Sequence, residues 1–113
     1  MRTNFNMDEQ NLTMIKGDTV AFGIEIDGLD GQDLDSAFLT CKEIPTSSAY
    51  IFQKSLGDGI TDNGDGTYNV RVAPEDTENV TAGAYFYDLQ IGINGDVYTL
   101  MLGLLTILQD VTD

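Results

Sequence analysis

The sequence contains no histidine and no tryptophan, and Cys41 is its only cysteine. A single cysteine excludes an intrachain disulfide, and the missing histidines exclude Cys/His zinc sites as well as Ser-His-Asp and Cys-His catalysis. The residue types therefore predict no catalytic residue, no metal ligand and no cofactor-binding residue. They favour a soluble structural or interaction domain over an enzyme.

Positive charge is also scarce, because 5 Lys and Arg residues stand against 19 Asp and Glu residues, which gives a net charge of -14. Nucleic acids and anionic membrane surfaces bind clustered Lys and Arg, so neither is expected as a partner. The longest apolar run, Leu100 to Leu105, is interrupted by Gly103 and is far shorter than a membrane span. The first residues lack the apolar segment of a secretory signal peptide. No membrane or nucleic-acid role is predicted.

What the sequence does have is apolar residues at alternate positions, the pattern of strands with one buried face. In the segment 84–94, for example, Tyr85, Tyr87 and Leu89 share one face and Asp88 lies on the other. We expect strands at Gln10–Ile15, Thr19–Asp27, Ser36–Lys42, Ala49–Lys54, Thr67–Val72, Ala84–Asn94 and Val97–Leu108.

Glycine, aspartate and asparagine clusters separate these strands. Asn94-Gly95 lies between two strong strands and is a typical two-residue hairpin turn. Pro74 is followed by acidic residues, which predicts one short helical turn near residues 74–79, because the free N–H groups of a first turn favour negative charge. The remaining chain shows no amphipathic helix.

Short strands separated by turns at regular intervals predict an all-β fold. We expect a two-sheet antiparallel immunoglobulin-like β-sandwich of about seven or eight strands. Residues 10–113 are assigned to this single β-sandwich domain, and residues 1–9 to a flexible N-terminal segment.

Tyr85 and Tyr87 share the inward face near the start of one expected strand. Immunoglobulin-like sandwiches often enter this strand through a corner tyrosine whose hydroxyl bonds to upstream backbone, and Tyr85 lies at the corresponding place. Tyr87 occupies the position that holds the second cysteine in antibody domains. Two interpretations stay open: Tyr85 forms a structural corner, or both tyrosines are ordinary core residues.

Several motifs along the chain occur in a familiar order. They are Lys16-Gly17-Asp18-Thr19, Asp30-Gly31-Gln32-Asp33-Leu34, Asp62-Asn63-Gly64-Asp65-Gly66-Thr67-Tyr68, Ala73-Pro74-Glu75-Asp76-Thr77, Gly83-Ala84-Tyr85-Phe86-Tyr87-Asp88-Leu89 and the ending from Thr99 to Thr112. Together they resemble the immunoglobulin-like β-sandwich domains of tailed-phage and prophage structural proteins, most of all the N-terminal domain of baseplate upper proteins. The resemblance covers about residues 12–112. It implies a non-enzymatic building block of the virion, assembled in the bacterial host cytoplasm, with phage tail or baseplate proteins as partners.

Two acidic loops are candidates for calcium binding, because calcium prefers carboxylate and carbonyl oxygens. One carries Asp27, Asp30, Asp33 and Asp35, and the other is the segment 58–65. Neither has the spacing of an EF-hand, so solvated turns are the favoured interpretation. No metal and no cofactor is assigned.

The segment Leu100–Leu108 differs from the other strands, because its apolar residues fall on both parities. A β-bulge at Gly103 would reverse the alternation and would still leave Met101, Leu104 and Leu108 facing outward. An outward apolar group of this kind indicates contact with another subunit or domain. We therefore assign Met101, Leu104 and Leu108 as an interaction surface and expect a homo-oligomer.

Two functions from different classes are compatible with these features. The first is a structural assembly module of a phage or prophage tail or baseplate, which mediates protein–protein contacts in the virion. The alternative is an immunoglobulin-like binding module for host-surface or carbohydrate recognition. Sugar sites usually present aromatic platforms, so the absence of tryptophan counts against the alternative.

Overall fold

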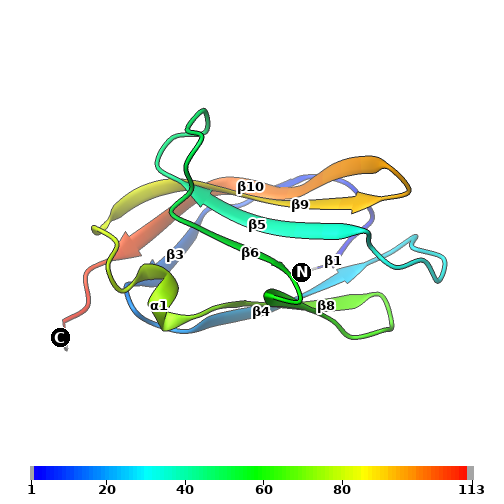
Figure 1. Cartoon of the computed structure of the whole chain (residues 1–113), viewed down its shortest axis with the longest axis horizontal. Coiled ribbons are helices and arrows are strands. Elements are labelled where there is room, and N and C mark those ends of the chain that lie inside the picture. Colours follow the sequence, from blue (N-terminus) through cyan, green and yellow to red (C-terminus); the bar gives the residue numbers. More distant parts are fainter. Residues whose placement is uncertain (1, 112–113) are drawn as a thin grey trace.

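The computed structural model describes residues 2–111 (Figure 1). They form ten strands and one four-residue helix, so the expected all-β fold is confirmed. The strands are β1 (Arg2–Thr3), β2 (Asp8–Glu9), β3 (Leu12–Ile15), β4 (Val20–Ile26), β5 (Ser36–Lys42), β6 (Phe52–Leu56), β7 (Gly59–Asp62), β8 (Thr67–Val72), β9 (Gly83–Ile93) and β10 (Asp96–Leu108). Helix α1 (Pro74–Thr77) lies within the range expected for the helical turn. Within these residues no helix is long and apolar enough to cross a membrane.

The strands form one hydrogen-bonded path in the order β1-β4-β8-β7-β6-β5-β9-β10-β2, and β3 also pairs with β10. This path curls on itself, so that β5, β9 and β10 form one wall and β4 with β8 the opposite wall (Figure 1). The expected sandwich of two separate sheets with about seven or eight strands is therefore wrong. The described chain is a ten-stranded, curled half-barrel. Parallel pairing of β6 with β7, at Ser55–Gly59 and Leu56–Ile60, joins the two walls on one side.

Strands β9 and β10 form a long antiparallel hairpin, as the turn sequence predicts. Asn94 and Gly95 make the turn, with φ angles of 55° and 82°. A turn with positive φ at both central residues matches the twist of the strands, and asparagine and glycine tolerate this conformation. Tyr85, Tyr87 and Leu89 are buried along β9, so its inner face follows the expected alternation.

The core lies between the two walls and is closed at one end by α1. Thr77 of α1 is completely buried, and its Oγ1 accepts a hydrogen bond from the Gly17 N–H at 2.9 Å. Asp76 accepts a bond from the Ala73 N–H at 2.7 Å and pairs with Lys54 Nζ at 3.0 Å. The short helix is thereby tied both to the turn after β3 and to strand β6.

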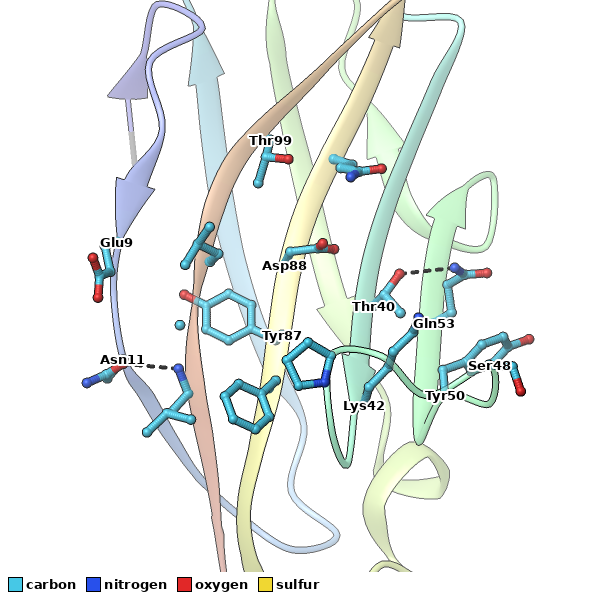
Figure 2. Close-up of a pocket in the computed structure, with 16 residues that line it drawn as sticks. Glu9, Asn11, Thr40, Lys42, Ser48, Tyr50, Gln53, Tyr87, Asp88 and Thr99 are labelled. Carbon is cyan, nitrogen blue, oxygen red and sulfur yellow. Dashed lines mark hydrogen bonds between the residues drawn. The ribbon is translucent and has the colours of Figure 1, made fainter.

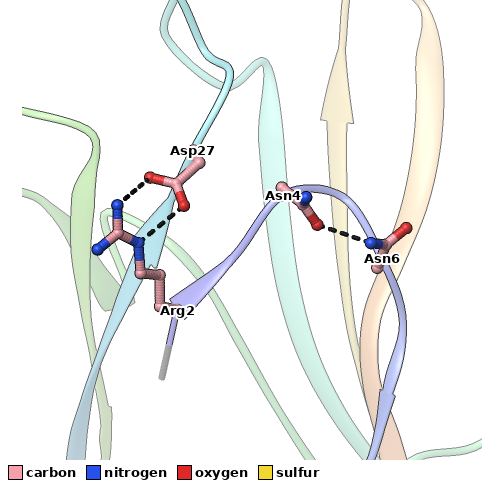
Figure 3. Close-up of polar contacts among 4 residues, drawn as sticks. All are labelled: Arg2, Asn4, Asn6 and Asp27. Atoms are coloured by element: carbon pink, nitrogen blue, oxygen red, sulfur yellow. Dashed lines mark hydrogen bonds and ion pairs between the residues drawn. The ribbon is translucent and has the colours of Figure 1, made fainter.

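Residues 2–9 lie along the edges of the sheet, because β1 pairs with β4 and β2 pairs with β10. Arg2 forms an ion pair with Asp27 at 2.8 Å, and Asn6 Nδ2 donates to Asn4 Oδ1 at 2.8 Å (Figure 3). Strand pairing therefore continues across the domain boundary expected at residue 10. The flexibility of residues 1–9 stays a prediction.

Candidate interaction surface

The outer face of the β5–β9–β10 wall gathers side chains from neighbouring strands into rows. Strand register places Leu104 of β10 beside Phe86 of β9, and Phe86 beside Lys42 of β5. The adjacent row is mostly polar and consists of Leu102, Asp88, Thr40 and Gln53. A row with two apolar side chains and Lys42 at its end thus borders a mostly polar row on a single sheet face.

A shallow depression of about 800 Å³ lies over this face. Figure 2 shows Thr40 and Asp88 on neighbouring strands, with Asn11 on one side and Tyr50 on the other. Two hydrogen bonds fix polar groups of the lining: Gln53 Nε2 donates to Thr40 Oγ1 at 3.0 Å, and the Leu104 N–H donates to Asn11 Oδ1 at 3.0 Å. The face is therefore concave, and hydrogen bonds hold part of its lining in place.

The apolar side chains exposed on this outer face include Phe38 of β5 and Val97 of β10, and we give the name apolar ridge to three others. They are Phe86, Leu104 and Leu108, with exposed fractions of 40%, 37% and 46%. Leu104 and Leu108 face outward, as expected from the sequence. Met101 is only 3% exposed, so its assignment to the surface is wrong.

The position of the β-bulge explains the burial of Met101. The register of β9 with β10 shifts between Thr99 and Met101, and both Leu100 and Met101 point into the core. At this bulge two residues of β10 lie opposite one of β9, so the alternation reverses at Leu100 and not at Gly103, the position considered from the sequence. Gly103 instead allows a close approach, because a Cβ added to it would lie 2.3 Å from the Gln10 carbonyl oxygen.

Phe86 and Tyr50 belong to the surface although the expected site did not include them. Phe86 lies between the inward Tyr85 and Tyr87, so strand alternation already places it on the outer face. An apolar residue at an outward position is the signal that identifies it. Tyr50 is 56% exposed and lies in the loop before β6. In a loop, strand alternation does not predict whether a side chain points inward or outward.

The two inward tyrosines of β9 each bond to backbone. The Tyr85 hydroxyl donates to the Thr81 carbonyl, which is the upstream bond of a tyrosine corner. The Tyr87 hydroxyl donates to the carbonyl of Gln10, a residue 77 positions away in sequence. Tyr87 therefore holds the segment between β2 and β3 against the wall that carries the apolar ridge. No local pattern could have predicted this partner.

Asp88 is the partly buried acidic group of the surface. Its burial raises the pKa of the carboxyl above the ordinary value, and the positive charge of Lys42 opposes this shift. A raised pKa means that the folded chain binds a proton more tightly than the unfolded chain. The ionised carboxylate consequently lowers stability at neutral pH, and this cost disappears as the pH falls below the raised pKa.

Asp88→Asn should therefore raise the melting temperature at about pH 7, and the gain should shrink towards about pH 4 because the wild-type carboxyl becomes protonated. The exposed residue Asp96 provides the matched control, since Asp96→Asn removes the same charge. Thermal melts of the three proteins at both pH values measure the effect. Equal gains for both variants, or a gain that does not depend on pH, would contradict the burial cost at Asp88.

The remaining residues that the sequence offers for chemistry lie away from this surface or have unreactive side chains. Cys41 is completely buried, and burial raises the pKa of its thiol to about 12, which suppresses the nucleophilic thiolate. Asp27 of the first acidic loop pairs with Arg2, and the hydrogen bond from Arg2 lowers the pKa of its carboxyl. Within residues 2–111, no three His, Cys, Asp or Glu residues are grouped as a metal site would require.

Neither a family model nor a curated protein matches the sequence. The fold, in contrast, is similar to that of several solved structures. The N-terminal domain of phage TP901-1 ORF48 superposes with a TM-score of 0.51 at 11% identity, over 96% of this chain and 99% of that domain. The immunoglobulin-like domain of mouse leukocyte-associated immunoglobulin-like receptor 1, solved as a strand-swapped dimer, gives a TM-score of 0.54 at 10% identity, over 87% of this chain and 88% of that one.

The endo-β-1,4-mannanase of Thermotoga petrophila gives a TM-score of 0.57 at 10% identity. That match covers 88% of this chain, which spans only 18% of the mannanase. At such identities the similarity concerns the fold alone. The chain thus has an immunoglobulin-like β fold, and a phage protein is among the proteins that share it.

Proposed function

We propose that the chain is a non-enzymatic assembly module of a phage or prophage tail or baseplate. It contacts other virion proteins through the apolar ridge on the outer face of β9 and β10. The observation that carries the proposal is this ridge: Phe86, Leu104 and Leu108 are each more than a third exposed on a sheet face. The fold shared with the phage TP901-1 domain along nearly the whole chain supports the phage setting.

The negative charge of the chain limits which contacts the apolar ridge can make. At a net charge of -14, separate copies repel one another, so contact must come from apolar burial and from partners of less negative charge. Salt screens the repulsion, with a Debye length of about 8–10 Å near physiological ionic strength, and leaves the burial of apolar groups intact. Self-association should therefore strengthen with salt. The chain forms a weak homo-oligomer alone and a tighter assembly inside the virion, after production in the bacterial cytoplasm.

Leu104→Asp should abolish this salt-dependent association while the fold persists, because it places a charge in the centre of the apolar ridge. Val97→Asp is the matched control: Val97 lies on the same strand, is 67% exposed and is outside the ridge. Sedimentation at low and high salt measures the mass of each protein. Wild-type protein that stays monomeric at high salt and high concentration, or Val97→Asp and Leu104→Asp behaving alike, would contradict the proposed surface.

An immunoglobulin-like binding module for carbohydrate or host-surface groups is the second candidate. The exposed Tyr50 ring beside the polar side chains of Thr40, Gln53 and Asp88 favours it, because sugar sites combine an aromatic face with hydrogen-bonding groups. Titration with soluble oligosaccharides distinguishes the two functions. Binding that Tyr50→Ala removes and Leu104→Asp leaves unchanged would support recognition of sugar over assembly.

A further inference from the structure

A second cavity, of about 290 Å³, lies on the inner side of the wall that carries the apolar ridge. It extends between β3, β4 and the core side chains of both walls. The lining consists of Gln10, Leu12, Thr13, Met14, Val20, Phe22, Leu39, Phe52, Val72, Tyr87, Met101 and Leu105. The cavity therefore faces the other side of β9 and β10 from the outer depression, and Tyr87 lines both.

The cavity connects the surface with the core. Leu12, Val20 and Phe22 are half-buried, whereas Met101 and Val72 are each only 3% exposed. A small molecule that enters past the half-buried side chains of β3 and β4 would thus contact fully buried groups. Apolar ligands are bound in pockets with this arrangement, in which most of their surface is removed from water.

The described lining is mostly apolar and carries no charged side chain. Among the described residues that form it, none carries a charge, although the chain has a net charge of -14. The Tyr87 hydroxyl already donates to the Gln10 carbonyl, and within residues 2–111 no buried side-chain polar atom lacks a hydrogen-bond partner. No buried polar side-chain atom of the lining therefore requires a water partner, so an apolar guest can displace water from the cavity without breaking such a bond.

We infer that this cavity binds a small, neutral aromatic molecule of one or two rings. Its volume of about 290 Å³ is roughly twice that of an engineered protein cavity, about 150 Å³, that binds benzene. The absence of a charged partner among its described lining residues excludes stable binding of an anion or a cation. Three aromatic rings, Phe22, Phe52 and Tyr87, favour edge-to-face contact with a ring, and the sulfur atoms of Met14 and Met101 favour it as well.

Indole is a suitable probe, because it is neutral and has an N–H that can donate to the free lone pair of the Tyr87 hydroxyl oxygen. The methionines supply the readout: Met14 and Met101 line the cavity, whereas Met7 is 52% exposed and outside it. In protein labelled with carbon-13 at the methionine methyls, indole should shift the signals of Met14 and Met101 saturably. The Met7 signal should not move.

A matched pair of variants tests the location. Leu12→Trp places a large ring at the entrance, whereas Ile15→Trp places the same ring on the exposed side of β3, where Ile15 is 42% exposed. We expect Leu12→Trp to weaken indole binding by about tenfold or more, the equivalent of about 1.4 kcal/mol, and Ile15→Trp to leave it unchanged. The anion octanoate should not shift the Met14 and Met101 signals.

Titration of the wild-type protein with indole tests the proposed binding even if Leu12→Trp fails to fold. The proposal is overturned if indole up to its solubility limit leaves Met14 and Met101 unshifted, or shifts Met7 equally. It is also overturned if octanoate shifts the two signals as indole does. Shifts that depend on protein concentration and not on indole would mean that a second copy fills the cavity, which equally contradicts it.

Discussion

Gly103→Ala should destabilise the fold by about 2–4 kcal/mol, although it adds a single methyl group to a strand. The added Cβ would lie 2.3 Å from the Gln10 carbonyl oxygen and 2.8 Å from its carbon. These are backbone atoms that cannot rotate away, so the segment between β2 and β3 must move off β10. The move would strain the bond from the Gln10 N–H to the Leu102 carbonyl, now 2.9 Å, and the bond from the Tyr87 hydroxyl to Gln10.

Gly23→Ala is the control for this prediction. Gly23 also lies within a strand without a positive φ, and a Cβ there would meet its nearest neighbour, Asn69 Oδ1, at 3.7 Å, an ordinary contact. Replacing glycine by alanine at a compatible site is neutral or stabilises by about 0.4–1 kcal/mol. Thermal melts should therefore show a drop of roughly 10–20 °C for Gly103→Ala alone. A Gly103→Ala protein that melts with wild type would disprove the close approach of the N-terminal segment.

Tyr85→Phe should cost about 1–3 kcal/mol, because it leaves the Thr81 carbonyl without the hydroxyl that bonds to it. The ring of Tyr85 is 8% exposed and keeps its packing in the variant, so the loss reports on the hydrogen bond. This bond closes the chain just before β9, and β9 pairs with both β5 and β10. The local defect should therefore appear as a lower stability of the whole domain.

Tyr50→Phe removes the same hydroxyl from a side chain that is 56% exposed, and its effect should be within about 0.5 kcal/mol of zero. Chemical denaturation of both variants, with equal slopes, gives the difference directly. Small and equal effects for Tyr85→Phe and Tyr50→Phe would show that Tyr85 is an ordinary core residue. That interpretation was left open by the sequence.

The parts of the fold that follow from local pattern could be predicted from the sequence. Alternation predicts β8 at residues 67–72 and, more weakly, β5 at residues 36–42 with their observed bounds, and Asn94-Gly95 predicts the hairpin turn. These features depend on neighbouring residues, whose periodicity and turn preferences are visible in a short window. The inner face of β9 was visible for the same reason.

Features that depend on distant strands were missed. Strand β7 begins at the last residue of the sequence Gly57-Asp58-Gly59, which is typical of a turn. It is a strand because it pairs with β6 and β8. The bulge at Leu100 results from the register between β9 and β10, and apolar residues on both parities of β10 hide its position. The glycine at position 103 does mark an irregular place in β10, but its cause is the close approach of the Gln10 backbone and not a bulge. This approach cannot be read from the sequence because only the fold brings Gln10 near Gly103. The sequence therefore places Met101 outward, although the fold buries it.

Cross-linking of assembled phage particles tests the central proposal, the assembly contact through the apolar ridge, most directly. Lys42 lies beside Phe86 in the strand register and gives a reactive amine at the border of the ridge. Arg71 is exposed on β8 in the opposite wall, so an Arg71→Lys variant supplies a control amine there.

Particles are purified from cells that produce the wild-type chain or the Arg71→Lys variant, treated with an amine-reactive cross-linker and analysed by mass spectrometry. The proposal predicts that the chain is found in the particles and that Lys42 is linked to another structural protein or to a second copy, whereas position 71 is not. Particles that lack the chain, or links from position 71 without links from Lys42, would contradict it.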